Sequence, residues 1–132
     1  MIGLDTNVLV RYIVQDDPKQ AELAAKYIES RCTVDCPGRL NVIVLCELVW
    51  VLDRGYGYDR QTVANVLRRI LTSPELFVEE DEAVWQALKM YEQSPAGFSD
   101  CLLGVLNHRN GASPTVTFDK KAAKESYFEL LK

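Results

Sequence analysis

Four acidic residues occupy positions where a carboxylate needs a physical explanation: Asp5, Glu47, Asp100 and Asp119. A carboxylate in or beside a hydrophobic core costs free energy unless it is paired, hydrogen-bonded or bound to a metal ion. Hard divalent cations such as Mg²⁺ and Mn²⁺ take oxygen ligands of this kind. A cation held on carboxylates suits phosphoryl chemistry, because it activates water and neutralises charge on the phosphate. Chemistry at a phosphate group is therefore one function that these residues could serve.

Three of the four acids are expected at one edge of a sheet. Asp5 directly follows the apolar segment Ile2–Leu4, and Asp119 comes two residues after a predicted strand that ends at Thr117. Asp100 stands at the start of a helical pattern. Because the ligand crevice of a parallel sheet lies outside the carboxyl ends of its strands, these carboxylates are expected at that rim.

Glu47 is the one charge in the apolar segment Asn41–Leu52, and no Lys or Arg lies three or four residues away to pair with it. Helix capping is the competing explanation for the other acids, since Asp5, Asp100 and Asp119 each fit an N-cap position. Glu47 could also pair with a distant cation or face solvent. Spacing alone leaves a metal site and a set of caps equally open.

Hydrophobic periodicity predicts alternating strands and helices. Strands are predicted at Ile2–Leu4, Thr33–Cys36, Leu76–Val78, Pro114–Thr117 and Tyr127–Leu131. Helices are predicted at 8–14, from Asp17-Pro18 through Ile28, at 41–52, from Asp59 to before Pro74, from Asp81 to before Pro95, and from Ser99 or Asp100 to Asn110. This alternation indicates a parallel sheet with helices on both faces.

Composition indicates an ordinary globular chain. Its 132 residues suit one domain, 1–132, and 48% are hydrophobic and 26% charged. No apolar run approaches the roughly 20 residues that span a bilayer. The net charge of −4 argues against a general nucleic-acid coat protein, which is normally basic.

The four cysteines lie in or beside apolar patterns, which is typical of buried thiols in a reducing cytoplasm. Cys32 and Cys36 lack further ligands nearby for zinc.

Four short segments surround the acids: Leu4-Asp5-Thr6-Asn7, VLCELVWVL around Glu47, Phe98-Ser99-Asp100 and Val116-Thr117-Phe118-Asp119. In their order and over nearly the whole chain, they resemble the PIN-domain family, in particular VapC-type toxins of bacterial toxin–antitoxin pairs. The resemblance implies a three-layer α/β/α sandwich with a central, mostly parallel sheet of four to five strands. It also implies a Mg²⁺- or Mn²⁺-dependent endoribonuclease that hydrolyses RNA phosphodiester bonds through metal-activated water.

The resemblance also implies a role for each acid. Asp5 and Asp100 would ligate the metal, and Glu47 and Asp119 would act directly or through water. Residues beside the acids would orient them by hydrogen bonds: Thr6, Asn7 and Thr117. The chain departs from many relatives at Gly97, where they carry an additional acid, and any second, weaker metal site would therefore lack a ligand.

Substrate and partners follow from the same resemblance. RNA near an acidic rim needs nearby cations, and the candidates are Arg11, Arg54, Arg60, Lys120, Lys121 and Lys124, with Lys120 and Lys121 favoured because they directly follow Asp119. The lone histidine, His108, is expected at a helix end and not as a general base. A VapB-type antitoxin and a homodimer are implied. Apolar residues of the first two helices could form either interface or belong to the core: Val10, Tyr12, Ile13, Leu23 and Tyr27.

Three other functions were compared with this one. A structure-specific DNA nuclease of PIN-like fold is generally longer. A receiver domain needs a phosphorylatable Asp at the end of a central strand, but Asp53 follows the apolar segment predicted to be a helix. A non-enzymatic α/β adaptor would be favoured by a degenerate acid, and none of the four is degenerate.

Overall fold

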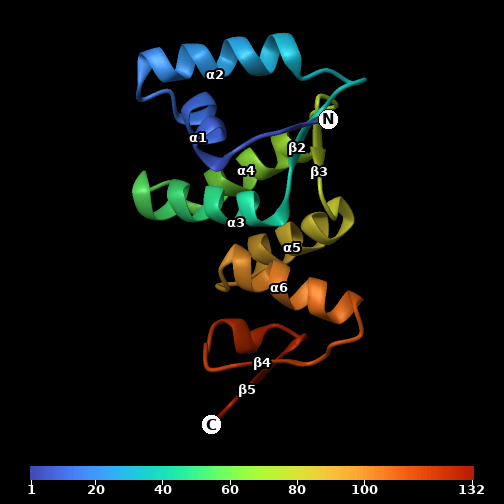
Figure 1. The fold of residues 1–132 in the computed structure, drawn as a ribbon. Coiled ribbons are helices and arrows are strands. Elements are labelled where there is room, and N and C mark those ends of the chain that lie inside the picture. The colour runs from blue at the N-terminus through green and yellow to red at the C-terminus, as the bar shows by residue number, and fades with distance from the viewer. The chain divides into compact units, whose positions relative to one another are not determined.

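The computed structural model describes residues 1–132, which form two units, Met1–Glu80 (unit 1) and Asp81–Lys132 (unit 2). Figure 1 shows the elements along the chain. Unit 1 contains β1 (Ile2–Gly3), α1 (Thr6–Val14), α2 (Pro18–Arg31), β2 (Gly38–Leu40), α3 (Val42–Trp50), the π-helical turn η1 (Val51–Gly55), α4 (Arg60–Leu71) and β3 (Leu76–Val78). Unit 2 contains α5 (Asp81–Gln93), α6 (Phe98–Arg109), β4 (Thr115–Thr117), the 3₁₀ turn η2 (Ala122–Lys124) and β5 (Phe128–Leu130).

Every strand pairing is parallel. In unit 1 the sheet has the order β1-β2-β3, and Gly38 is opposite Ile2 on one side and Leu76 on the other. In unit 2, β4 pairs with β5, with Thr115 opposite Phe128. Helical segments separate consecutive strands, as parallel pairing requires. The predicted α/β class is therefore confirmed, with three strands in unit 1 and two in unit 2.

Three predicted helix starts are confirmed by their caps. The side chains of Asp17, Asn41 and Asp59 each accept a hydrogen bond from the backbone N–H three residues on. Such a bond satisfies one of the N–H groups that a helix leaves unpaired at its start. The polar residue ahead of each apolar pattern therefore marks the boundary correctly.

The strand predicted at Thr33–Cys36 is wrong, and the strand lies instead at Gly38–Leu40. Residues 33–36 form a tight turn, because the Thr33 hydroxyl accepts from the Cys36 N–H at 3.0 Å and the Thr33 N–H donates to the Cys36 carbonyl at 3.0 Å. Gly38 is the first residue of this strand, and close packing leaves little room for a side chain there. A Cβ there would lie 2.7 Å from Leu4 Cδ1.

The core of unit 1 lies between its sheet and helices. Its largest fully buried side chains are aliphatic and come from α1, β2, α3, η1 and α4: Leu9, Leu40, Leu45, Leu48, Leu52, Val63 and Leu67. The predicted helix over 41–52 is thus confirmed, and it continues as η1 to Gly55. No helix of the chain is long and apolar enough to cross a bilayer.

Unit 2 is built on the packing of α5 against α6 and of β5 against α6. Tyr91 and Phe98 meet edge to face, with ring centroids 6.0 Å apart. The predicted start of the last long helix needs correction, because α6 begins at Phe98 with Gly97 as its N-cap. Gly97 is extended and its carbonyl accepts from the Cys101 N–H, which places Asp100 inside the first turn.

Substitution of Gly104 tests the packing of β5 on α6. A Cβ at Gly104 would lie 2.5 Å from Phe128 Cε2, within a buried contact. Glycine to alanine in a helix ordinarily stabilises by about 1 kcal/mol. We expect Gly104→Ala instead to lower the free energy of unfolding by about 1–3 kcal/mol, the usual cost of overpacking. Urea unfolding measures the change in the free energy of unfolding. Gly55→Ala is the control, because its Cβ would meet only Val51 Cγ1 at 3.6 Å, and equal effects of the two would contradict the prediction.

Candidate active site

Asp5 lies at the carboxyl end of β1 and at the N-cap of α1, with extended backbone (φ −81°, ψ 155°). Unlike Asp17, Asn41 and Asp59, it makes no side-chain capping bond, although its backbone carbonyl accepts from the Val8 N–H at 3.1 Å. The exposed carboxylate therefore keeps all its acceptor sites. Capping does not account for an acid at this position.

Glu47 lies on the solvent-facing side of α3, so burial does not require it to have a partner. It nevertheless has one, because the Thr6 hydroxyl donates to Glu47 Oε1 at 2.7 Å. Thr6 is the first residue of α1 and is 7% exposed, the one polar residue among the buried side chains. This hydrogen bond holds Glu47 beside the start of α1, where Asp5 also lies.

Asp100 is half-buried in the first turn of α6, and its carboxylate accepts no hydrogen bond. Burial raises the pKa of Asp100, and the neighbouring negative charge of Asp119 raises it further. Unit 2 therefore brings two of the predicted acids close enough to repel each other. A cation between them would remove that repulsion.

Asp119 is fixed by the loop that follows β4. Its Oδ1 accepts from the backbone N–H groups of Lys121 at 2.8 Å and Ala122 at 3.2 Å. Its own N–H donates to the Thr117 hydroxyl at 2.9 Å. Asp119 thus caps the turn leading into η2, as the alternative explanation predicted, and lies beside Asp100 as well. Besides Thr117, Thr6 and Asn7 were expected to orient the acids. Thr6 donates to Glu47, whereas Asn7 is exposed.

The acids fit a hard divalent cation by their donor chemistry. Asp5 and Asp100 provide carboxylates with no hydrogen-bond donor on them, and oxygen is the ligand that Mg²⁺ and Mn²⁺ prefer. In unit 1, Glu47 is bonded to Thr6, the residue after Asp5, and in unit 2 Asp100 lies near Asp119. Nowhere in the chain do three or more His, Cys, Asp or Glu side chains gather as a metal-binding group.

Gly97, where the resemblance to PIN-domain proteins led us to expect a further acid, leaves space beside Asp100. A Cβ at Gly97 would lie 3.7 Å from Asp100 Oδ2, an ordinary van der Waals contact, and the backbone there is one that any residue adopts. The departure from the family pattern is therefore not imposed by packing.

Arg11, a predicted RNA-binding residue, is engaged within unit 1. Its guanidinium donates to Gln20, Asp16 and the Tyr56 hydroxyl, and Tyr56 donates in turn to Asp16 at 2.7 Å. The Tyr56 hydrogen bond lowers the pKa of Asp16, and the same contact raises the pKa of Tyr56. Sequence reasoning missed this network, because its members are up to 45 residues apart. Lys120 and Lys121, by contrast, are exposed beside Asp119.

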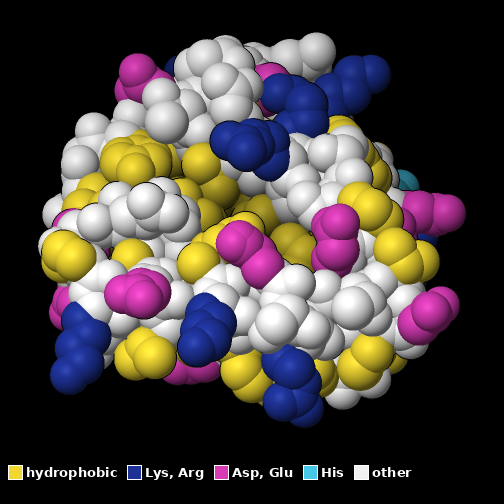
Figure 2. All heavy atoms as spheres, turned by 90° about the horizontal axis from the view of Figure 1, so that it is seen from above, with side chains coloured by type: hydrophobic (Ala, Val, Ile, Leu, Met, Phe, Trp, Pro, Cys, Tyr) yellow, Lys and Arg dark blue, Asp and Glu magenta, His cyan; other side chains and the backbone are white.

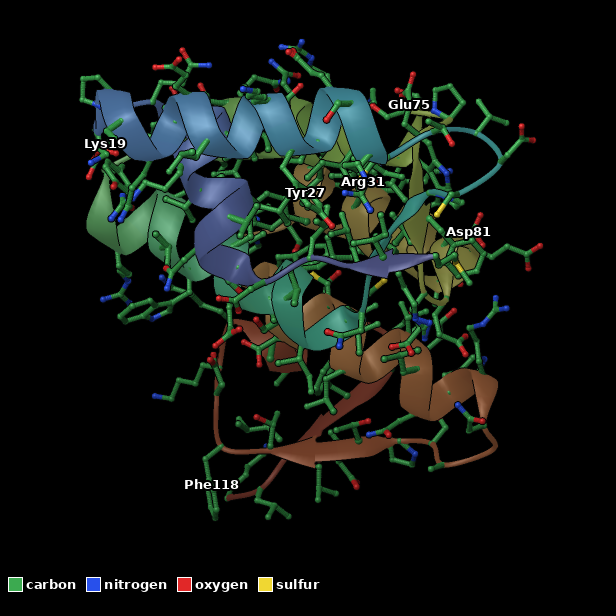
Figure 3. All side chains as sticks on the ribbon, turned by 45° about the horizontal axis from the view of Figure 1, so that its top comes forward. Lys19, Tyr27, Arg31, Glu75, Asp81 and Phe118 are labelled. Atoms are coloured by element: carbon green, nitrogen blue, oxygen red, sulfur yellow. The ribbon has the colours of Figure 1, made fainter.

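An apolar groove of about 490 Å³ runs between β1, α1 and α2. Leu23 and Tyr27 lie on it and are 61% and 41% exposed, whereas Val10 is buried in the core. Figure 2 looks onto the side where α2 lies and shows hydrophobic side chains exposed among charges of both signs. In Figure 3, Tyr27 and Arg31 project from α2, and the Arg31 guanidinium lies 5.5 Å from the Tyr27 ring centre.

Comparison with known proteins is consistent with this arrangement. The family model for the PIN domain matches residues 2–125. The chain belongs to the PIN-domain family. This match confirms the resemblance noted in the sequence. It also confirms the predicted fold, because the PIN domain has a three-layer α/β/α fold. The chain is also 27% identical over 121 residues to a VapC ribonuclease of Aquifex aeolicus (strain VF5), covering 92% of this chain and 89% of that protein. No solved structure matches.

Neutralising Asp100 tests the repulsion within this PIN protein. Because its pKa is raised in the folded state, ionised Asp100 destabilises the metal-free protein at neutral pH, and the penalty disappears as the pH falls through that raised pKa. We expect Asp100→Asn to raise the melting temperature in a chelating buffer at pH 7. This gain should shrink as the pH is lowered toward 4, as circular dichroism would show.

The control for Asp100→Asn is Glu129→Gln, which removes the same charge from an exposed position on β5. If both variants shift the melting temperature equally, the effect reflects net charge alone and the proposed repulsion is absent. Added Mg²⁺ should stabilise the unaltered chain more than Asp100→Asn, since binding to the native state raises its stability.

Proposed function

We propose that this PIN protein is a VapC-type toxin that acts as a Mg²⁺- or Mn²⁺-dependent endoribonuclease. The observation that carries the proposal is the pair of carboxylates, Asp5 and Asp100, that accept no hydrogen bond and each have a second acid nearby. We further propose that residues 1–132 act as one PIN domain. The family match, which extends across both units, supports this.

Each acid has a distinct role in this proposal. Asp5 and Asp100 would ligate the cation, and Glu47 and Asp119 would bind it directly or through water. When bound, the cation supplies Lewis acidity toward the phosphate and lowers the pKa of water. The chain's own residues hold the ligands: Thr6 orients Glu47, and the backbone N–H groups of the η2 turn orient Asp119.

RNA must approach a site whose formal charge is negative. Lys120 and Lys121 are proposed to contact its phosphates, because both are exposed and directly follow Asp119. A phosphate on Arg11 would have to compete with Asp16 for the guanidinium, so we assign Arg11 mainly to the contact between α1, the start of α2 and Tyr56. Binding through phosphates should weaken as salt increases.

A VapB-type antitoxin and a second copy of the chain are the proposed protein partners. The groove between β1, α1 and α2, with exposed Leu23 and Tyr27, is suited to the apolar face of an antitoxin segment. The cytoplasm is the proposed location, which agrees with four free cysteines. The neighbouring reading frame is a direct check, since a small DNA-binding antitoxin encoded there would support the pair.

Cleavage by the purified chain tests the activity. Without antitoxin, it should cut RNA in Mg²⁺ or Mn²⁺ and lose all cutting in a chelator. Asp5→Asn and Asp100→Asn should each lower the rate at least about 100-fold, because each removes a charged ligand of the cation. Denaturing gels of labelled RNA measure the rate. Unchanged cutting by Asp5→Asn would exclude the assignment, cutting of branched DNA alone would favour the DNA nuclease, and no cutting of either would favour the adaptor.

The Thr6–Glu47 hydrogen bond provides a separate prediction. Thr6→Val keeps the shape of a buried side chain and removes the hydroxyl that donates to Glu47. We expect a loss of about 10- to 100-fold in activity or Mg²⁺ affinity, the usual effect of removing a group that orients a ligand. Thr6→Ser keeps the hydroxyl and should restore most of the activity. Equal loss in both variants would indicate a packing defect, which would contradict the orienting role.

A further inference from the structure

The exposed face of α3 contains apolar residues on either side of an acid. Ile43, Glu47 and Trp50 are spaced at i, i+4 and i+7, which places them in one row along the helix. Ile43 is 66% exposed and Trp50 is 65% exposed, whereas Val44, Leu45, Leu48 and Val49 on the other side are buried. A large indole in water costs free energy that a partner would recover.

The Trp50 ring has no partner within the chain. The ring contacts of the structure pair Tyr56 with Tyr58, Tyr91 with Phe98 and His108 with Tyr127, and guanidinium groups lie over Tyr27 and Phe77. Trp50 takes part in none of them. It lies three residues after Glu47, so the two Cβ atoms are about 5–6 Å apart. The indole is therefore available directly beside a proposed catalytic acid.

The helix departs from α geometry immediately after Trp50. Val51–Gly55 form the π-helical turn η1, a rare feature that occurs frequently at functional sites. Arg54 lies in this turn with its side chain 74% exposed, and its one ion pair, to Asp53, is long at 3.8 Å. An aromatic surface next to an exposed guanidinium is the combination that binds single-stranded nucleic acid, through base stacking and phosphate contact.

We propose that Trp50 is the stacking surface for an unpaired base of the RNA substrate, with Arg54 contacting the phosphate backbone. The inference rests on the proposed ribonuclease function and assigns Trp50 as a residue that positions the substrate. A base stacked beside Glu47 places its own nucleotide next to the scissile phosphate. A base within a duplex already has neighbours on both faces, so the enzyme cuts where a nucleotide is unpaired. Stacking tolerates any base, because every base has a π-face.

The chain has two tryptophans, Trp50 and Trp85, which allows a direct test. Trp85→Phe leaves Trp50 as the sole indole, and Trp50→Phe leaves Trp85, which is 38% exposed on α5, as the matched control. Both carry Asp100→Asn so that RNA is bound in Mg²⁺ without being cut. A 12-nucleotide single-stranded RNA should quench Trp50 emission as it saturates the protein and leave Trp85 unchanged. The same RNA annealed to its complement should quench neither.

Kinetics of otherwise unaltered chains give a second measurement. Trp50→Ala should raise KM for single-stranded RNA about 5- to 150-fold, the range that stacking of one base provides, with little change in kcat. Trp50→Phe should retain most of the affinity, and Trp85→Ala should match the unaltered chain. A loss in kcat of the same size as the loss in binding would contradict a stacking role.

Several results would overturn the inference. The inference is wrong if RNA binds, as measured by fluorescence anisotropy, without quenching Trp50. It is also wrong if the duplex quenches Trp50 as strongly as the single strand does. An emission shift that follows protein concentration without RNA would show that a second copy covers this face. If the unaltered chain cuts RNA but Trp50 is not quenched, only the stacking proposal fails. If Trp50 is quenched but no RNA is cut, binding by Trp50 stands and the proposed hydrolysis fails.

Discussion

Each unit keeps a carboxylate without a hydrogen-bond donor, and this costly feature is the one on which the proposed site depends. In unit 2, burial raises the pKa of Asp100 and the neighbouring charge of Asp119 raises it further, while the half-buried carboxylate has no hydrogen-bond donor. Asp5 in unit 1 likewise keeps an unbonded carboxylate at the end of β1. A protein designed only for stability would place amides or caps at these positions. The structure instead uses hydrogen bonds from Thr6 and from the backbone after Asp119 to fix the neighbouring acids.

The residues at helix N-cap positions differ in whether their side chains make the capping hydrogen bond. Asp17, Asn41 and Asp59 all make the N-cap bond. Asp5 occupies the same backbone position and leaves that bond unmade. Asp119 makes its caps and still contributes charge beside Asp100. Capping and the proposed metal binding, which spacing could not separate, are thus assigned to different residues and are combined in Asp119.

In the proposed function, the exposed face of α3 contributes both to catalysis and to RNA recognition. Burial of Leu45, Leu48 and Leu52 against the core fixes the rotation of the helix, and that rotation turns Glu47 and Trp50 to solvent together. A hydrophobic segment thus presents one acid and one large aromatic ring on its polar side. The π-helical turn that follows carries Arg54 at the end of the same row.

The sequence by itself determined most helix boundaries and the parallel α/β class, because caps and periodicity act within a few residues. It placed the second strand wrongly, because a hydrogen-bonded turn occupies Thr33–Cys36 and the close packing at Gly38 depends on Leu4, more than 30 residues away. It read Glu47 as a charge in a buried helix, and only the folded chain shows it exposed and bonded to Thr6. The Arg11–Asp16–Tyr56 network and the free face of Trp50 were likewise decided by tertiary structure, because each depends on which surfaces other elements cover.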